Sequence, residues 1–440
     1  MVKNKENSED LDFWATNSEE GGWNISSTDE GSQKMNDEES EQQIKIQTGS
    51  DVVDDYFIEE ETSEDERMIV NMGPQHPSTH GVLRLQVELE GEAVRRVKPI
   101  IGYLHTGMEK TGEELTYLQG PTNTTRMDYN ELVFSLTTEK LLDIEVPARA
   151  ETIRILMTEL NRVSSHLVAL ATGGMDIGAL SMMIFGFRER ELVLNFFEKT
   201  TGLRMNHNYI RPGGVAADLP DNWQKDVKEI LKIIPEKLKD YDEMLLDNPI
   251  WQGRLQNVGI ITPEECLAYG ITGPSLRASG QGWDLRKMQP YSGIEKFDFD
   301  VPVLQESDVF ARWRIKVLEI LESLKIVEQA MDNMPKGPYK IQDKKVTPPP
   351  RKRLDESMEA LIHHFKIYTE GFKVPEGDAY VAVESPRGEL GCYIVSDGSS
   401  KPFRMHVRGP SFCNLMADSP IADAVAAIAS LDPVIGDVDR

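Results

Sequence analysis

The sequence predicts an α+β fold, in which a central bundle of helices lies between small antiparallel sheets formed near the two ends of the chain. Alternating apolar and polar residues over 83–89 predict a half-buried strand. Apolar residues at steps of three and four from 153 to 170 predict a long helix with one apolar face. Beyond residue 376 the pattern returns to short runs that are typical of strands.

The first 67 residues differ in composition from the rest of the chain. They contain 5 Lys and Arg against 21 Asp and Glu, and they are rich in Ser and Asn. Such a segment buries too little apolar surface to offset the entropy that is lost on ordering. We predict a disordered acidic extension over 1–67, which is either a solvated tail or an anchor to a partner near Trp14 and Trp23.

Residues 68–440 are predicted to form one domain, which begins with an N-terminal β region over 68–105. Its first strand at 83–89 is followed by the turn Glu90-Gly91-Glu92, and the chain returns over 93–102. We therefore expect a hairpin or a small sheet in this region.

A helical core over 106–375 follows. The helix at 153–170 is predicted to end at Gly173-Gly174, and a second helix from about 179 to 199 is predicted to end at Gly202. Further helical periods are found near 221–245, 307–333 and 353–371, with a break at Pro348-Pro349-Pro350 before the last of them.

The C-terminal region over 376–440 returns to β-structure. Its short alternating runs predict strands at 379–384, 392–396 and 403–407, and an Ala-rich helix is expected near 420–430.

Composition excludes several classes of protein. A net charge of −26 argues against binding to nucleic acid, because the chain could not neutralise phosphates in bulk. Three widely spaced Cys exclude a disulfide scaffold and any four-Cys cluster or zinc site, and they suit a reducing compartment. Neither an apolar run of about 18 residues nor a secretory h-region is visible. We expect a cytoplasmic chain, or one held at a membrane by its partners.

Nucleotide-binding motifs are also missing from the sequence. No G-x-x-x-x-G-K-[ST] phosphate loop occurs, and Gly280-x-Gly282 lacks the strand and helix that flank a dinucleotide site.

Three segments carry residues that could do chemistry. His76 and His80 lie in a turn with two Pro and two Gly, where a His held by rigid backbone could donate a proton; the alternative is that both bond only local backbone groups. Tyr129 in Arg126-Met127-Asp128-Tyr129 could donate a hydrogen bond or a proton, or it could be a packing residue. Asp176 is either a helix N-cap or a buried carboxylate that orients an imidazole.

Long motifs in the same order resemble the D-subunit (49 kDa) family of respiratory complex I, the NADH:quinone oxidoreductase. The resemblance covers residues 68–440 and rests on these segments: GPQHPSTHGVLR, IIGYLHTGMEK, RMDY, ELNRVSSHLVAL, MDIGA, NHNYIRPGGV, LIHHFKIYTEG and DPVIGDVDR. It implies a fold like the large subunit of [NiFe] hydrogenases, with a helical bundle and flanking β-structure.

The same resemblance implies an emptied metal site. Hydrogenases bind nickel with two Cys pairs, but the first Cys here is Cys266, and Val434 and Asp437 stand where the C-terminal thiolates would be. Since a nickel centre needs soft thiolate ligands, hydrogenase activity is disfavoured. We expect a cavity that is used by a quinone, with no metal and no iron–sulfur cluster in this chain.

The resemblance assigns roles to single residues. His80 matches the family's quinone-headgroup His, Tyr129 matches the Tyr that bonds the other quinone carbonyl, and Asp176 matches the carboxylate paired with that His. Val434 and Arg440 match C-terminal positions near the cavity. His80 and Tyr129 would supply the two protons of quinone reduction, with Asp176 stabilising the imidazolium.

The expected partners and place in the cell also follow from the resemblance. A [4Fe–4S] cluster in the B subunit would deliver the electrons, and the C, I and membrane-embedded H subunits would be further partners. We expect a peripheral subunit on the cytoplasmic face of a bacterial cell membrane, in a proton-translocating enzyme. Two positions depart from the family: Ile100 replaces a frequent His and Thr106 replaces a frequent Arg. Neither is one of the three central residues, but the family's supporting hydrogen bonds around Glu109 do not carry over to this chain by resemblance.

Other functions remain open at this point. The chain could serve a complex of the same family that takes electrons from ferredoxin or a deazaflavin, since the donor module lies in other subunits. It could be a hydrogenase-like large subunit, which the missing Cys ligands disfavour. It could also be a scaffold without quinone chemistry, which the presence of His80, Tyr129 and Asp176 together disfavours.

Overall fold

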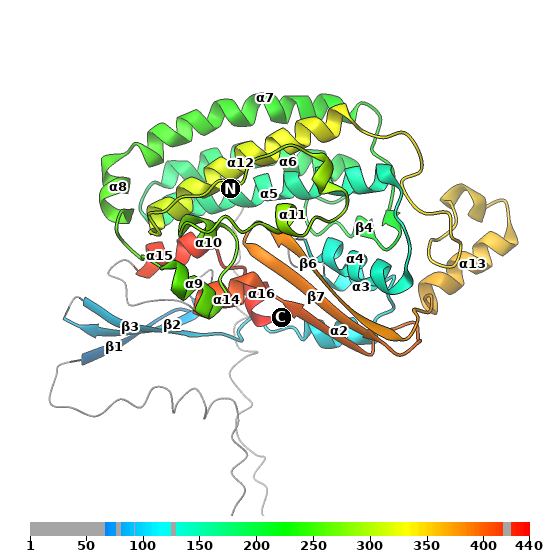
Figure 1. The fold of residues 1–440 in the computed structure, drawn as a ribbon, viewed down its shortest axis with the longest axis horizontal. Helices are drawn as coiled ribbons and strands as arrows, with labels where there is room; N and C mark the ends of the chain where they lie inside the picture. The colour runs from blue at the N-terminus through cyan, green and yellow to red at the C-terminus, as the bar shows by residue number, and fades with distance from the viewer. Residues whose placement is uncertain (1–66, 76–80, 92, 125–128, 417–423) are drawn as a thin grey trace, which may run out of the picture. The chain divides into compact units, whose positions relative to one another are not determined.

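The computed structural model describes residues 67–75, 81–91, 93–124, 129–416 and 424–440. Within these residues, long helices are combined with small antiparallel sheets, so the predicted α+β class is confirmed (Figure 1). The predicted extension over 1–67, apart from Arg67, and the candidate His80 lie outside the described residues.

The N-terminal sheet has the antiparallel order β1 (Arg67–Met72), β2 (Arg84–Glu90) and β3 (Ala93–Ile100). The predicted hairpin is therefore present, and β1 adds an edge strand that the pattern does not predict. Inward side chains at the start of β2 form a cluster with the end of the chain: Leu83, Leu85 and Val87 pack with Leu415, Ile428, Ile435 and Val438. The two ends of the domain thus share one small core.

That core is completed by three short C-terminal helices, α14 (Pro410–Met416), α15 (Ala424–Leu431) and α16 (Ile435–Asp439). Figure 1 shows them in red beside the N-terminal strands. The predicted Ala-rich helix is α15.

The helical core is built around α5 (Ala148–Asp176), which packs against α6 (Leu180–Thr201) and α12 (Val309–Asp332), while α7 (Trp223–Tyr241) covers α6 and α12 from outside (Figure 1). Helix α6 ends at Gly202 as predicted, where a φ of 84° suits glycine.

The prediction that Gly173-Gly174 ends the first long helix is wrong, because α5 runs through both residues. A Cβ at Gly173 would lie 2.3 Å from the Trp313 ring, and one at Gly174 would lie 2.8 Å from Met182 Cβ. These glycines therefore allow neighbouring helices to approach closely, and the helix ends two residues later at Asp176, shortly before Gly178 at φ 99°.

Shorter helices connect the long ones. They are α2 (Met108–Glu114), α3 (Gly120–Thr124), α4 (Asn130–Leu142), α8 (Pro249–Leu255), α9 (Pro263–Tyr269), α10 (Pro274–Ala278), α11 (Leu285–Met288) and α13 (Met358–Thr369). The helix predicted at 353–371 begins only at Met358, since the Ser357 hydroxyl caps it by accepting a hydrogen bond from the Ala360 amide. No helix among the described residues is both long and apolar enough to cross a membrane.

The C-terminal sheet has the order β6 (Gly377–Ser385), β7 (Gly388–Ser396) and β8 (Arg404–Arg408), all antiparallel, which confirms the three predicted strands. It packs against α4 (Figure 1). A second hairpin of two short strands, β4 (Ile210–Arg211) and β5 (Gly214–Val215), lies beside α4 and α5.

Candidate functional site

The C-terminal helix α16 holds the loop that joins β3 to α2. The two carboxylate oxygens of the buried Asp439 accept hydrogen bonds from the amides of Gly102, at 2.8 Å, and Leu104, at 2.6 Å. The His105 ring nitrogen Nδ1 lies 2.7 Å from the Asp439 carbonyl oxygen. Residues from opposite ends of the domain are thereby fixed against each other.

Next to these contacts lies a cavity of about 370 Å³, open on one side, which we call the C-terminal cavity. Three separate segments line it: Val82, then Leu104, Thr106 and Met108, and then Pro433, Val434, Ile435 and Gly436. Its walls are mostly apolar, and its volume is in the range of small-molecule sites. Val82 follows the predicted His80 by two residues, and Val434 lies in the wall as the N-cap residue just before α16.

The other C-terminal candidates lie beside this cavity. Asp437 is buried, its Oδ2 accepts a hydrogen bond of 2.9 Å from the Ser411 amide, and burial raises its pKa. The Arg440 guanidinium donates a hydrogen bond to the Val407 carbonyl and lies 5.2 Å from the Phe412 ring centre, so it does not point into the cavity.

Among the described residues, no thiol lines the C-terminal cavity. Cys266 and Cys392 are buried elsewhere, and the half-buried Cys413 is not part of its wall. The part of the chain that the structure describes holds no group of three or more His, Cys, Asp or Glu side chains suited to a metal ion.

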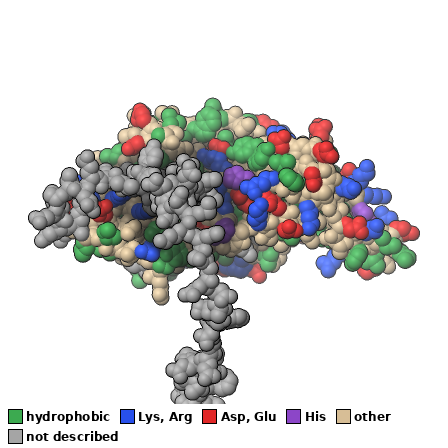
Figure 2. All heavy atoms as spheres, turned by 90° about the horizontal axis from the view of Figure 1, so that it is seen from below, with side chains coloured by type: hydrophobic (Ala, Val, Ile, Leu, Met, Phe, Trp, Pro, Cys, Tyr) green, Lys and Arg blue, Asp and Glu red, His purple; other side chains and the backbone are tan. Residues whose placement is uncertain are grey.

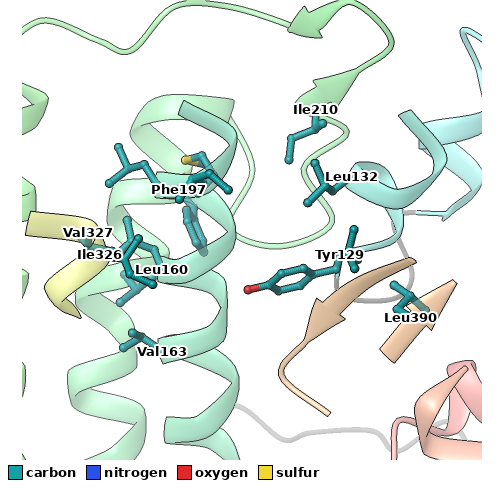
Figure 3. Close-up of a cluster of buried hydrophobic side chains, with 14 of the residues drawn as sticks. Tyr129, Leu132, Leu160, Val163, Phe197, Ile210, Ile326, Val327 and Leu390 are labelled. Atoms are coloured by element: carbon teal, nitrogen blue, oxygen red, sulfur yellow. The ribbon is translucent and has the colours of Figure 1, made fainter. Parts of the chain in front are cut away.

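Tyr129 is placed at the start of α4, with its ring turned toward α5 (Figure 3). Its backbone adopts φ 67°, a left-handed conformation that is unfavourable for a bulky residue and is often found at functional sites. The side chain is only 5% exposed, and its hydroxyl donates a hydrogen bond to the Thr158 carbonyl of α5. Burial raises the Tyr129 pKa well above its usual value.

A buried network of charged side chains supports this position. The Arg162 guanidinium lies 5.4 Å from the Tyr129 ring centre and donates to the main-chain carbonyls of Glu384, at 2.6 Å, and Ser385, at 3.1 Å. Arg162 also pairs with Glu159, which accepts a further hydrogen bond from Arg286.

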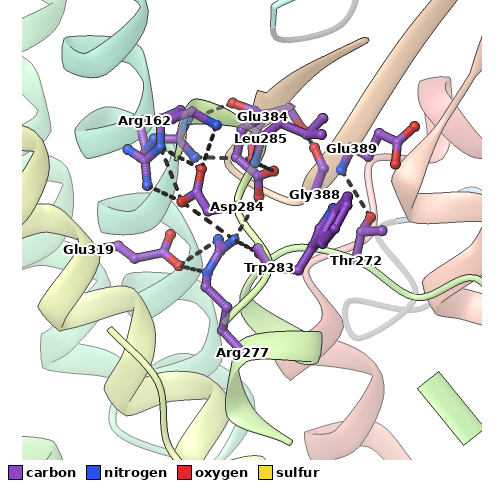
Figure 4. Close-up of polar contacts among 12 residues, drawn as sticks. Arg162, Thr272, Arg277, Trp283, Asp284, Leu285, Glu319, Glu384, Gly388 and Glu389 are labelled. Atoms are coloured by element: carbon purple, nitrogen blue, oxygen red, sulfur yellow. Dashed lines mark hydrogen bonds and ion pairs between the residues drawn. The ribbon is translucent and has the colours of Figure 1, made fainter. Parts of the chain in front are cut away.

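The network continues away from Tyr129 through Arg277 (Figure 4). Arg277 contacts Glu319 at 2.7 Å and Glu384 at 2.8 Å, and Glu319 also lies 2.9 Å from the ring of His166. Burial alone would raise the pKa of Glu319, but Arg277 and His166 hold it well below its usual value. Since these side chains come from α5, α10, α12 and β6, the network joins the helical core to the C-terminal sheet.

A second cavity of about 120 Å³ is lined in part by Tyr129, and we call it the tyrosine cavity. Most of its lining is polar or aromatic, and it comes from α4, α5, α6 and the segment after α6: Tyr129, Glu131, Leu132, Met157, Thr158, Asn161, Ser164, Arg190, Leu194, Phe197, Arg204, Met205, Asn206, His207, Tyr209 and Ile210.

Asp176 is separated from Tyr129 in this structure. It is the half-buried last residue of α5, whereas the Tyr129 hydroxyl bonds the carbonyl of Thr158 on the same helix. The eighteen residues between Thr158 and Asp176 correspond to about 27 Å of helix. The structure therefore does not bring these two predicted residues together, and the N-cap interpretation of Asp176 is wrong, since Ala179 caps α6.

Several residues of the site are not among the sequence candidates. The Tyr129 ring is contacted by Arg162, and its cavity is shared by Glu131. The charged network that supports Tyr129 also includes Arg277 and Arg286. One signal in the sequence could have found part of this set: Glu159, Arg162 and His166 place charge at helical spacing on α5, which is otherwise apolar on most sides.

Comparisons with known proteins give a consistent result. The family model for the 49 kDa subunit of respiratory-chain NADH dehydrogenase matches residues 176–440. The D subunit of the NADH-quinone oxidoreductase of Rhodococcus jostii (strain RHA1) is 55% identical over 405 residues, which cover 86% of this chain and 92% of the relative. The corresponding D subunit of Mycobacteroides abscessus is 51% identical over 427 residues, covering 90% of this chain and 99% of the relative. The D 1 subunit of Salinispora arenicola is 53% identical over 405 residues, covering 86% and 92%.

Proposed function

Since the chain belongs to the family of the 49 kDa subunit of respiratory-chain NADH dehydrogenase, and is a subunit of an NADH-quinone oxidoreductase, we propose that it forms the quinone-reduction site of that enzyme with the B subunit. The fold would be that of the [NiFe]-hydrogenase large subunit, and quinone would bind at the position that the metal occupies in hydrogenases. His80, Tyr129 and Asp176 are the proposed proton-handling residues. Val434 is proposed to line the binding cavity, and Arg440 is proposed to lie near it.

The C-terminal cavity is the observation that carries this proposal. Its walls come from Val82, from residues 104–108 and from 433–436. Val82 follows His80 by two residues in the sequence. Residues 433–436 belong to the C-terminal segment that would hold nickel in a hydrogenase. Val434 and Met108 give it an apolar surface that suits a quinone ring.

Quinone reduction requires two electrons and two protons. The [4Fe–4S] cluster of the B subunit would supply electrons one at a time. Tyr129 lines the tyrosine cavity rather than the C-terminal cavity, so the quinone headgroup would have to reach its hydroxyl, which would exchange its hydrogen bond to Thr158 for one to a quinone oxygen. His80 would donate the second proton, and the Asp176 carboxylate would stabilise the imidazolium before transfer.

The expected partners are the B, C, I and membrane-embedded H subunits, on the cytoplasmic face of a bacterial cell membrane. Large exposed apolar side chains support such contacts, because isolated soluble proteins seldom gather them on one element. Helix α13 exposes Met358, Leu361, Ile362 and Phe365, and Figure 2 shows hydrophobic side chains among Lys and Arg at this end of the domain. Helix α6 exposes Leu180, Ile184 and Phe187 along one face.

Filling the C-terminal cavity tests the proposal. Val434→Phe adds a ring where the quinone ring would lie, and it should raise the KM for quinone or lower turnover by about tenfold or more, which corresponds to the loss of about 1.4 kcal/mol of transition-state stabilisation. The rate is measured in membranes that contain the whole complex, relative to electron transfer from NADH to an artificial acceptor that bypasses the quinone site. Val303→Phe, which places the same ring at a half-exposed position in a loop, serves as the matched control. An unchanged relative rate in Val434→Phe would contradict the proposed site.

A further inference from the structure

Glu131 lies two residues after Tyr129 and shares the tyrosine cavity with it. The side chain keeps part of its surface exposed, but its carboxylate is turned inward onto the backbone of the segment after α6. Its oxygens accept hydrogen bonds from the amides of Asn208, Tyr209, at 2.8 Å, and Ile210, at 3.1 Å. A carboxylate with three amide donors is held in one place, at the wall of the cavity that Tyr129 also lines.

The cavity has the size and chemistry of a small water site. A volume of about 120 Å³ has room for several waters, and such waters need polar partners. Asn161 and Ser164 of α5 are among the polar side chains that line the cavity and offer such partners. Met205 and Asn206 are exposed at its rim, whereas Tyr129 is buried at its inner end.

We propose that Glu131 holds the proton that reloads Tyr129, passing it through waters of the tyrosine cavity after Tyr129 has protonated the reduced quinone. This inference rests on the proposed role of Tyr129 in quinone reduction. Glu131 touches no substrate in this scheme, so it acts only through Tyr129.

The proton balance of the cycle is simple. Quinone receives its electrons from NADH through the complex, and the Tyr129 O–H bond breaks as an O–H bond forms on the quinone. The resulting phenolate takes a proton from a water of the cavity, and that water takes one from the protonated Glu131 carboxyl. The carboxylate then regains a proton from solvent at the exposed rim.

The proton affinities of the two groups suit this direction of transfer. Burial raises the pKa of Glu131 to about 7, so the carboxyl is partly protonated near neutral pH. Burial also raises the Tyr129 pKa well above its usual value, so its phenolate is a strong base. Transfer from Glu131 to a Tyr129 phenolate is therefore favourable, and a carboxyl that titrates near the working pH can be reloaded quickly.

The charged and titratable side chains near Glu131 come from α6, from the segment after α6 and from β4. Arg190 of α6 lines the cavity, as do Arg204 and His207 of the segment after α6, while Arg211 lowers the Glu131 pKa from a greater distance. Helix α5 contributes only uncharged side chains to this wall. Since no second carboxylate lines the cavity among the described residues, Glu131 is its one acidic proton carrier there.

The test uses the whole complex in membranes, with NADH:quinone turnover divided by NADH:artificial-acceptor turnover. Glu131→Gln keeps the size of the side chain but cannot hold the proton, so the relative rate should fall on the order of tenfold, less than the loss of a direct proton donor. Glu131→Asp keeps a carboxyl and should recover most of the rate with a shifted pH profile. Glu145→Gln, at an exposed position just after α4, is the matched control and should leave the relative rate unchanged.

A second background separates this inference from the proposed function. In a chain that already carries Tyr129→Phe, Glu131→Gln should cause no further loss. An equal loss in both backgrounds would overturn the role of Glu131 while leaving that of Tyr129 intact, whereas full activity of Tyr129→Phe alone would overturn both. If Glu131→Gln prevents assembly, the pH profile of Glu131→Asp decides: a shifted profile supports the relay, and an unshifted profile contradicts it.

Discussion

Arg162 lies 5.4 Å from the centre of the Tyr129 ring, and it joins that ring to the buried charges of the helical core. The guanidinium pairs with Glu159 on its own helix and donates to two main-chain carbonyls at the end of β6. Three rigid parts of the fold, α4, α5 and the C-terminal sheet, therefore determine the position of one tyrosine. Such support is what a proton donor requires if its hydroxyl is to stay near a substrate oxygen.

Tyr129→Phe removes one hydroxyl and little else. It should lower NADH:quinone turnover about ten- to a hundredfold, the effect of losing one hydrogen bond of roughly 1.5–3 kcal/mol to a reduced oxygen. Electron transfer from NADH to an artificial acceptor should continue, because no electron carrier is touched. An equal loss in both assays would indicate misassembly, and an unchanged quinone rate would show that the hydroxyl is not a donor.

His80 and Asp176 are expected to act as one unit. Asp176→Asn keeps the shape of the side chain but removes the charge that stabilises a protonated His80. The double change His80→Ala with Asp176→Asn should then cost little more than the worse single change in quinone turnover. Full additivity of the two losses would show that these residues work independently.

Gly173 tests the packing of the core independently of the chemistry. Gly173→Ala would place a Cβ 2.3 Å from the Trp313 ring, and overpacking of this kind costs about 1–3 kcal/mol. The midpoint of thermal inactivation of quinone reductase activity in membranes should fall. Gly253→Ala in α8 meets no atom within 4 Å, so this matched control should leave the midpoint unchanged or slightly higher.

Glu131 should make stability depend on pH. Its pKa is raised from 4.5 to about 7 in the folded chain, so the stabilisation from its protonated form is complete below about pH 4.5 and is lost as the pH rises through 7. Since part of the side chain is exposed, we expect a difference of about 1–3 kcal/mol. Between pH 5 and 8 the thermal midpoint of the unaltered complex should fall relative to that of Glu131→Gln. If the thermal midpoints of the two complexes change with pH in the same way, the raised pKa of Glu131 is refuted.

The sequence predicts those elements whose burial is one-sided. The strand β2 and the helices α6 and α7 each bury one face, so their periodicity is visible. Helix α4 is not predicted, because its buried residues lie on most sides, with polar residues such as Ser135, Thr137 and Glu139 among them. The glycines of α5 misled the prediction of its end, since close helix packing and helix termination use the same residue type.

The candidate site could be predicted only in part. Motifs identify Tyr129, Asp176 and Val434 as residues, but no spacing in the sequence indicates that Asp439 ties the 102–104 loop to the end of the chain. Buried ion pairs such as Arg277 with Glu319 join positions far apart in sequence, and only the folded structure shows them. Glu131 looks like an ordinary charge in the first turn of a helix until its three amide donors are known.

Labelling with a photoreactive quinone analogue tests the central claim most directly. The whole complex in membranes is irradiated with the analogue, and the adducts on this chain are located by mass spectrometry of its peptides. The account predicts adducts in the peptides that line the C-terminal cavity, at 81–108 and 433–440, which decrease when excess unlabelled quinone competes. Adducts that are confined to other segments of the chain, or that persist in the presence of excess quinone, would contradict it.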